Sequence, residues 1–145
     1  MYEIEMVNKV CDYLRDKGIA AVTEVPFMQQ SIDLVYLENN QLIAMEFKID
    51  NWKRAIEQAS SHFLGTNEVY ICIPKPKKGM PEKLSEAMAK TDVGLVFFDE
   101  TSDNIMEVVY PAKHNKKVWK IGKIWLNEAF ENRVHGVWAL SLIHI

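Results

Sequence analysis

The stretch that most constrains the fold is residues 31–48, SIDLVYLENNQLIAMEFK, in which two apolar runs flank the polar break ENNQ. Apolar runs of this length on either side of an asparagine-rich turn are typical of the two strands of a β-hairpin. With the two asparagines as a two-residue turn, Glu38 pairs with Gln41 and Leu37 pairs with Leu42. This register then decides which residues face one another along the whole hairpin.

The same register brings charged residues together on one face of the hairpin. Asp33 falls directly opposite Glu46, and Lys48 shares the face of Glu46 because side chains alternate with period two. Directly opposed side chains have Cβ atoms about 4.5–5.5 Å apart, and like charges placed there are destabilising. We therefore expect a cation between the two carboxylates.

A plainer alternative is that these charges form the solvated face of an edge hairpin, with Glu46 paired to Lys48, an arrangement worth little energy. The residues between the charges argue against it, because they are apolar on both faces: Leu34, Val35, Ala44, Met45 and Phe47. A strand that is apolar on both faces is a buried strand of a covered sheet. Charges in such a strand are costly unless they are paired or bind metal.

Size and composition bound the class of protein. The chain of 145 residues is enough for one domain with a sizeable core, and its 48% hydrophobic and 26% charged residues are ordinary for a soluble globular protein. The net charge of −3 argues against a strongly basic nucleic-acid coat but leaves a local basic patch open. No apolar run reaches the length of a membrane span and no signal peptide is present, so we expect a cytoplasmic protein. Cys11 and Cys72 lie in apolar patterns and are expected to be free core thiols, with a disulfide as the less favoured alternative.

The hydrophobic periodicity predicts an α/β order of elements. These are helix 2–17, strand 19–25, strands 31–37 and 42–48, helix 51–63, strand 69–73, helix 81–90, strand 93–98, edge strand 105–110 and helix 119–131. A strand, a helix and a strand in succession form a crossover that makes the two strands parallel. The prediction is a central mixed sheet, with a three-stranded antiparallel meander and a parallel strand after a crossover helix, flanked by helices.

The ends of the first elements carry their own signals. Gly18 is expected just past the first helix, and Pro26 is expected to end the strand that follows. Glu3 and Glu5 lie in the first helical turn, where acidic residues favour the helix dipole. Glu3 also flanks the helix's predicted apolar stripe of Ile4, Val7, Val10, Cys11 and Leu14, so a role in a site stays open for it.

Two opposed carboxylates suit a hard divalent cation. Mg²⁺ prefers oxygen ligands and is commonly held by one or two carboxylates, waters and substrate phosphates. Asp33 and Glu46 would be its ligands, with the backbone carbonyl of Phe47 as a further one. Lys48 would orient a water or stabilise developing charge on phosphorus. The sequence offers no Gly-rich phosphate loop and no zinc-type Cys/His spacing.

Asp33, twelve residues and then Glu46-Phe47-Lys48 resemble the PD-(D/E)XK nuclease superfamily, whose fold is also called restriction-endonuclease-like. The resemblance covers about residues 1–75 and implies a Mg²⁺-dependent nuclease, with Mn²⁺ as a substitute. Many members carry an assisting Gln on the helix after the lysine, which Gln58 matches. RecB-like members have Tyr four residues later, where this chain has His62, and the motif's Pro is replaced by Ser31-Ile32.

A basic stretch near the C-terminal end offers a nucleic-acid contact. Lys113, Lys116, Lys117, Lys120 and Lys123 are interleaved with His114 and Trp119, a combination that suits a phosphate backbone or simply a solvated loop and helix face. Residues 1–138 are expected to form one domain. The tail 139–145 resembles the translation of sequencing-adapter read-through, so we set it aside as a non-native candidate together with His144.

The sequence therefore predicts a metal-dependent nuclease that acts on nucleic acid, with DNA favoured over RNA as the substrate. It predicts no membrane partner. The alternative is a catalytically inactive nucleic-acid-binding or assembly module on the same fold, and a third reading is a purely structural domain. The resemblance is compatible with a homodimer, although no dimer interface can be identified from the sequence.

Overall fold

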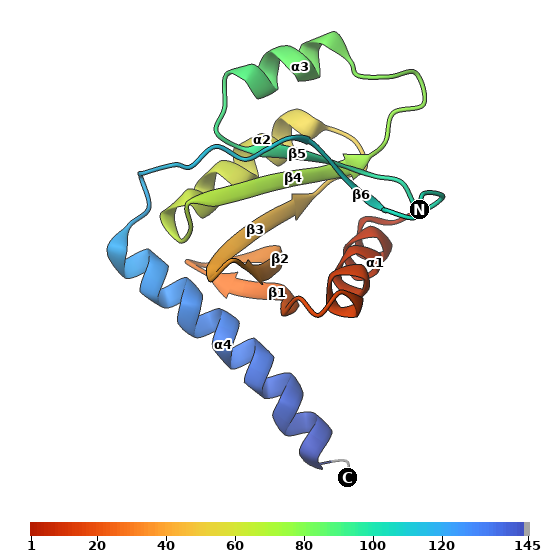
Figure 1. Ribbon diagram of the computed structural model, residues 1–145. Helices are drawn as coiled ribbons and strands as arrows, with labels where there is room; N and C mark the ends of the chain where they lie inside the picture. The colour runs from red at the N-terminus through yellow and green to blue at the C-terminus, as the bar shows by residue number, and fades with distance from the viewer. Residues whose placement is uncertain (144–145) are drawn as a thin grey trace.

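Six strands form one mixed sheet in the order β1-β2-β3-β4-β5-β6 (Figure 1). The computed structural model describes the backbone of residues 1–143 and the side chains of residues 1–136. The strands are β1 (Ala21–Phe27), β2 (Gln30–Glu38), β3 (Gln41–Phe47), β4 (Glu68–Pro74), β5 (Gly94–Phe98) and β6 (Met106–Tyr110). Strands β1 to β3 form an antiparallel meander, β4 and β5 each run parallel to the strand before, and β6 is an antiparallel edge strand. The predicted fold class is confirmed.

Helices cover both faces of the sheet. Within the described residues they are α1 (Glu3–Asp16), α2 (Trp52–Ser60), the 3₁₀ helix η1 (Ser61–Leu64), α3 (Glu82–Ala89) and α4 (Lys120–Ile143). Helix α1 packs its buried side chains on one face, against residues such as Met45 and Phe47. Helices α2, α3 and α4 contribute to the core on the opposite face. The strands between these two cores are therefore apolar on both sides, as their sequences predict.

The hairpin of β2 and β3 forms in the predicted register, with Glu38 opposite Gln41 and Leu37 opposite Leu42. Asn39 and Asn40 connect the strands with φ angles of 53° and 62°. Positive φ at both central residues is the signature of a type I′ turn, which asparagine tolerates better than most residues. The turn residues thus fix the register on which the candidate site depends.

The crossover from β3 through α2 to β4 also forms as predicted, and it gives a parallel pair from Ile43↔Glu68 to Phe47↔Cys72. Asn51 caps α2, because its side-chain oxygen accepts the backbone N–H of Arg54 at 3.3 Å. Helix α2 ends at Ser60, and the chain tightens into η1, so the single predicted helix 51–63 is wrong in its last turn.

Several predicted details at the N-terminal end need correction. Strand β1 continues through Pro26, which an edge strand tolerates because one side of its backbone has no partner strand. The predicted apolar stripe of α1 is buried at Val7, Val10, Cys11 and Leu14, but Ile4 is 51% exposed and Met6 is buried instead. Gly18 does follow α1 as predicted, with φ +80° and its N–H bonded to the carbonyl of Arg15.

Helix α4 begins near the predicted residue but extends to Ile143 instead of residue 131. Phe130 and Val134 pack on the core, and Arg133 donates to the carbonyl oxygen of Thr23 at 2.8 Å, so contacts with the body support the additional turns. The residues 139–143 of the tail are helical, whereas residues 144 and 145, and with them His144, lie outside the described residues.

Cys11 and Cys72 are both buried and free, as expected for core thiols. Burial raises the pKa of each thiol. Within the described part of the chain, no helix has both the length and the apolarity needed to cross a membrane.

Candidate functional site

The candidate site lies where strands β2 and β3 part. Their ladder runs from the turn only as far as Leu34↔Met45. Beyond that point β2 continues beside β1, and β3 continues beside β4. The next residues along the two strands are Asp33 and Glu46, which the register places opposite each other at the fork.

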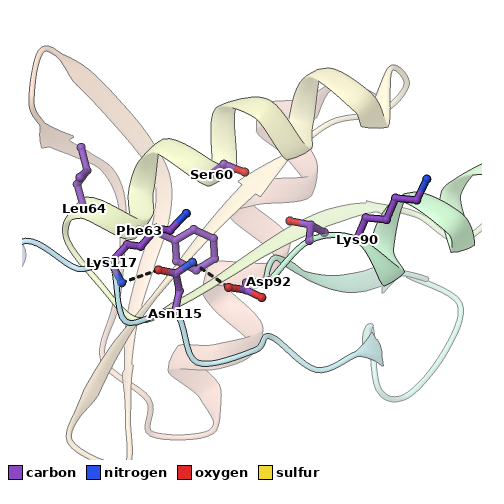
Figure 2. Close-up of a pocket in the computed structure, with 8 residues that line it drawn as sticks. Ser60, Phe63, Leu64, Lys90, Asp92, Asn115 and Lys117 are labelled. Atoms are coloured by element: carbon purple, nitrogen blue, oxygen red, sulfur yellow. Dashed lines mark hydrogen bonds between the residues drawn. The ribbon is translucent and has the colours of Figure 1, made fainter.

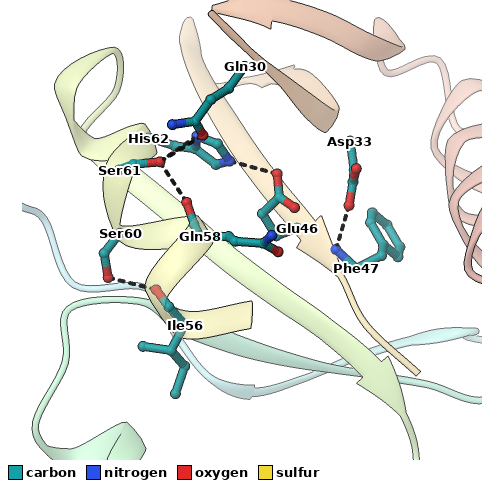
Figure 3. Close-up of polar contacts among 9 residues, drawn as sticks. All are labelled: Gln30, Asp33, Glu46, Phe47, Ile56, Gln58, Ser60, Ser61 and His62. Atoms are coloured by element: carbon teal, nitrogen blue, oxygen red, sulfur yellow. Dashed lines mark hydrogen bonds and ion pairs between the residues drawn. The ribbon is translucent and has the colours of Figure 1, made fainter. Parts of the chain in front are cut away.

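Beyond Leu34 the backbones of β2 and β3 no longer pair, and the Asp33 side chain accepts a backbone N–H of β3 instead. The backbone N–H of Phe47 donates to Asp33 Oδ2 at 2.9 Å (Figure 3). Burial and the negative charge of Glu46 raise the pKa of Asp33 to about 7, against the smaller opposing effect of the Phe47 N–H and with a further small contribution from Glu3. The two acids are therefore close enough to repel each other, as the register predicts.

Glu46 has a buried partner in His62, which the sequence predicts as a weaker candidate site residue but not as the partner of Glu46. His62 Nε2 donates to Glu46 Oε1 at 2.6 Å, and the two residues are 2% and 6% exposed (Figure 3). Glu46 therefore does not belong to a solvated polar face, and the predicted alternative of a surface pair with Lys48 is wrong. A buried carboxylate needs such a partner, because burying an unpaired charge is costly.

These bonds leave each carboxylate an oxygen for a further ligand. His62 bonds to one oxygen of Glu46, and the Phe47 N–H bonds to one oxygen of Asp33. Two carboxylate oxygens with a nearby backbone carbonyl and waters are chemically suited to Mg²⁺. Among the described residues, no group of three or more His, Cys, Asp or Glu side chains is arranged to hold a metal ion.

Lys48 follows β3 directly and is half-buried. Its backbone N–H donates to the carbonyl of Cys72 at 3.1 Å, which fixes the main chain at this position. Among the described side chains, the Lys48 ammonium forms no ion pair with Asp33 or Glu46. The structure therefore brings the two acids together, whereas Lys48 is not among the residues that line the pocket at Glu46.

The two acidic residues at the start of α1, Glu3 and Glu5, differ in whether they contact the candidate site. Glu3 Oε1 accepts the backbone N–H of Ile49 at 3.3 Å, so α1 touches the segment just after Lys48. Glu3 also contributes to the raised pKa of Asp33. Glu5 is exposed, and its charge acts on Lys9 instead. Of the two, Glu3 is the residue that the structure places at the candidate site.

A pocket of about 490 Å³ opens beside Glu46. Gln58 lines it, as its predicted position on the helix requires, and the other lining residues are Gln30, Ser31, Arg54, Glu57 and Ser61. Ser61 Oγ donates to the carbonyl oxygen of Gln58 at 2.7 Å and lies 3.2 Å from Gln30 Oε1 (Figure 3). Arg54 was missed, although its spacing of four residues before Gln58 places it on the same helical face.

Hydrogen bonds hold the basic stretch against the rest of the domain. They lie beside a second pocket, of about 340 Å³ (Figure 2). The side chain of Asn115 donates to Asp92 Oδ2 at 2.9 Å and accepts the backbone N–H of Lys117 at 2.7 Å. Asn67 donates to the Asn115 carbonyl oxygen at 2.8 Å. The lysines proposed for nucleic-acid contact are all exposed along this anchored segment: Lys113, Lys116, Lys117 and Lys120.

No protein-family model matches the chain, and no curated protein matches it. Among solved structures, the chain is similar to the crystal structure of an FdxN element excision controlling factor protein from Anabaena variabilis. The two share 12% sequence identity, with a TM-score of 0.45 over 71% of this chain and 96% of that one. We draw no conclusion about function from this likeness.

Proposed function

We propose that the chain is a metal-dependent nuclease of the PD-(D/E)XK superfamily. It would hydrolyse phosphodiester bonds of nucleic acid, with DNA favoured over RNA as the substrate. The observation that carries the proposal is the pair of carboxylates at the fork between β2 and β3. Asp33 and Glu46 are close enough for repulsion to help raise the pKa of Asp33 to about 7, and a pocket opens beside Glu46. A divalent cation between the acids would relieve that repulsion.

Asp33 and Glu46 would hold the cation, with the Phe47 carbonyl as a further ligand. When bound, Mg²⁺ or Mn²⁺ neutralises charge on a phosphoryl oxygen and lowers the pKa of a water. Lys48 would supply positive charge to the phosphate, since among the described side chains its ammonium forms no ion pair.

The surrounding residues position the acids and the substrate. His62 fixes the orientation of Glu46 through its hydrogen bond, as a second partner of a ligating carboxylate commonly does. Gln58 and Arg54 line the pocket and offer donors to a phosphate. Glu3 holds the Ile49 N–H and thereby steadies the segment that carries Lys48.

The second candidate function is a nucleic-acid-binding module without catalysis. Two observations favour it: Glu46 already has a buried partner in His62, and the described residues contain no cluster of three metal-binding side chains. Such a module would use the anchored lysines around residues 113–120 and would bind DNA in a salt-sensitive way.

Cleavage of mixed DNA substrates tests the proposal. The parent chain is expected to cleave with Mg²⁺ or Mn²⁺ and to lose this activity with a chelator. Asp33→Asn and Lys48→Ala should each lower the rate by orders of magnitude, whereas Lys83→Ala, an exposed lysine of α3, should not change it. Equal cleavage by Lys48→Ala and the parent chain would show that the site is wrongly assigned. DNA binding without any cation uptake would favour the non-catalytic module.

A further inference from the structure

Helix α4 carries a second apolar face that does not pack on the sheet. The face of α4 that packs on the sheet is formed by the buried residues Gly122, Leu126 and Phe130. Ile121, Ile124 and Trp125 follow the i, i+3, i+4 spacing of a different face and are 46–50% exposed. A helix of a soluble protein usually turns polar side chains to solvent. This outward apolar face is therefore a candidate contact surface.

Trp119, just before α4, joins this face. Its ring lies 5.6 Å from that of Trp125 at an interplanar angle of 80°, an edge-to-face pair. In such a pair the partner covers a face of only one of the two rings. Both tryptophans are more than two-fifths exposed, at 44% and 47%. We name Trp119, Ile121, Ile124 and Trp125 the tryptophan face.

The charge around the tryptophan face selects its partner. Residues 113–127 contain five lysines and no acidic residue, and the first acid after them, Glu128, is exposed and lines a pocket together with Trp125. Lys120 and Lys123 lie on α4 beside the face and are exposed. A second copy docked through the same face would bring two lysine-rich surfaces together, which like-charge repulsion disfavours. A polyanion with flat apolar groups meets both the charge and the rings.

The position of the face connects it to the candidate site. The backbone N–H of Trp119 donates to the carbonyl oxygen of Leu64 at 3.1 Å, and Leu64 ends η1. The same four-residue helix carries His62, the partner of Glu46. The short helix η1 is therefore bonded to Trp119 through Leu64 and to Glu46 through His62.

We propose that the tryptophan face binds single-stranded nucleic acid, with bases stacked on Trp119 and Trp125 and phosphates held by the neighbouring lysines. This inference rests on the proposed function, because the bound strand would be the substrate of the nuclease. Binding of the strand itself needs no metal. Aromatic side chains that stack bases within a basic surface are the usual means of holding single strands without sequence preference.

The test measures binding of a fluorescein-labelled deoxythymidine oligomer by anisotropy, with chelator present and in the Asp33→Asn background. A failure of cleavage therefore leaves the result unaffected, and a failure of binding leaves the cleavage test unaffected. Trp125→Ala is expected to weaken binding by about 5- to 100-fold, and Trp125→Phe, which keeps a ring, by less. Val108→Ala, which shortens an exposed apolar side chain on β6, should bind as the background does.

An oligomer that lacks bases but keeps the sugar–phosphate chain separates stacking from charge. Trp125→Ala should bind it as the background does, whereas Lys120→Gln should weaken binding to both oligomers and reduce the salt dependence. Circular dichroism checks that each variant is folded, and Trp119→Ala provides a second test of the face. Unchanged oligomer binding by both folded alanine variants would overturn the proposal. So would a finding that Trp125→Ala instead abolishes self-association or binding to anionic lipid vesicles.

Discussion

Replacing Asp33 by asparagine removes one of the two opposed charges while keeping the oxygen that accepts the Phe47 N–H. In the metal-free protein, burial and Glu46 raise the pKa of Asp33 from 3.8 to about 7. Because the folded state holds the proton more tightly than the unfolded state, Asp33 contributes stability below about pH 4 that is lost as the pH rises through about 7. Asp33→Asn should therefore stabilise the metal-free protein at alkaline pH.

The size of the effect follows from the pKa. A rise of about three pKa units corresponds to at most about 4 kcal/mol, at about 1.36 kcal/mol for each unit. Solvent reaches the half-buried carboxyl and screens the repulsion, so we expect about 1–2 kcal/mol.

Urea unfolding in the presence of chelator, at about pH 5 and about pH 8, measures this difference. The Asp33→Asn protein should lose less stability than the parent between the two conditions and should be the more stable of the two at the higher pH. Asp103→Asn, a change at an exposed aspartate before β6, is the matched control and should follow the parent. If Asp33→Asn is less stable than the parent at about pH 8, the two acids do not repel each other as described.

Three further changes test the fold around the site by the same unfolding measurement. His62→Ala leaves the Glu46 carboxylate buried without its partner and should lower the free energy of unfolding by about 3–5 kcal/mol. His62→Gln, whose amide also donates, should lower it by less. Equal losses of stability in the two variants would argue against the hydrogen bond. Asn40→Gly should raise stability by about 0.5 kcal/mol and Asn40→Ala should lower it by about 1 kcal/mol, because the residue holds a positive φ of 62° in the hairpin turn; an alanine variant as stable as the parent would contradict the turn type. Gly122→Ala should cost about 1–3 kcal/mol because the added Cβ would meet the carbonyl oxygen of Leu64, and a neutral effect would mean that α4 docks differently.

Much of the site's framework was predictable because short-range rules determine it. The Asn39-Asn40 turn allows one hairpin register, and that register alone places Asp33 opposite Glu46. The apolar runs on both sides of these residues predict a covered sheet, and the crossover through α2 forces the parallel strand. These features need only neighbouring residues and the alternation of side chains.

The rest depends on tertiary contacts that periodicity does not encode. His62 lies in η1, where the helix tightens after Ser60, and its contact with Glu46 joins residues 16 positions apart that a helical pattern does not pair. Pro26 stays within β1 because the strand lies at the edge of the sheet, a fact of strand order rather than of local sequence. Trp125 follows a helical spacing typical of a buried stripe, yet it faces outward because α4 buries a neighbouring face.

Calorimetric titration of Mn²⁺ and Mg²⁺ into the parent chain and into Glu46→Gln tests the central claim most directly, namely that Asp33 and Glu46 together form a divalent-cation site. The variant keeps the size of the side chain and an oxygen that accepts from His62. The parent chain is expected to take up the cation saturably, and Glu46→Gln is expected to lose this uptake. Absence of uptake by the parent chain, or equal uptake by the variant, would contradict it.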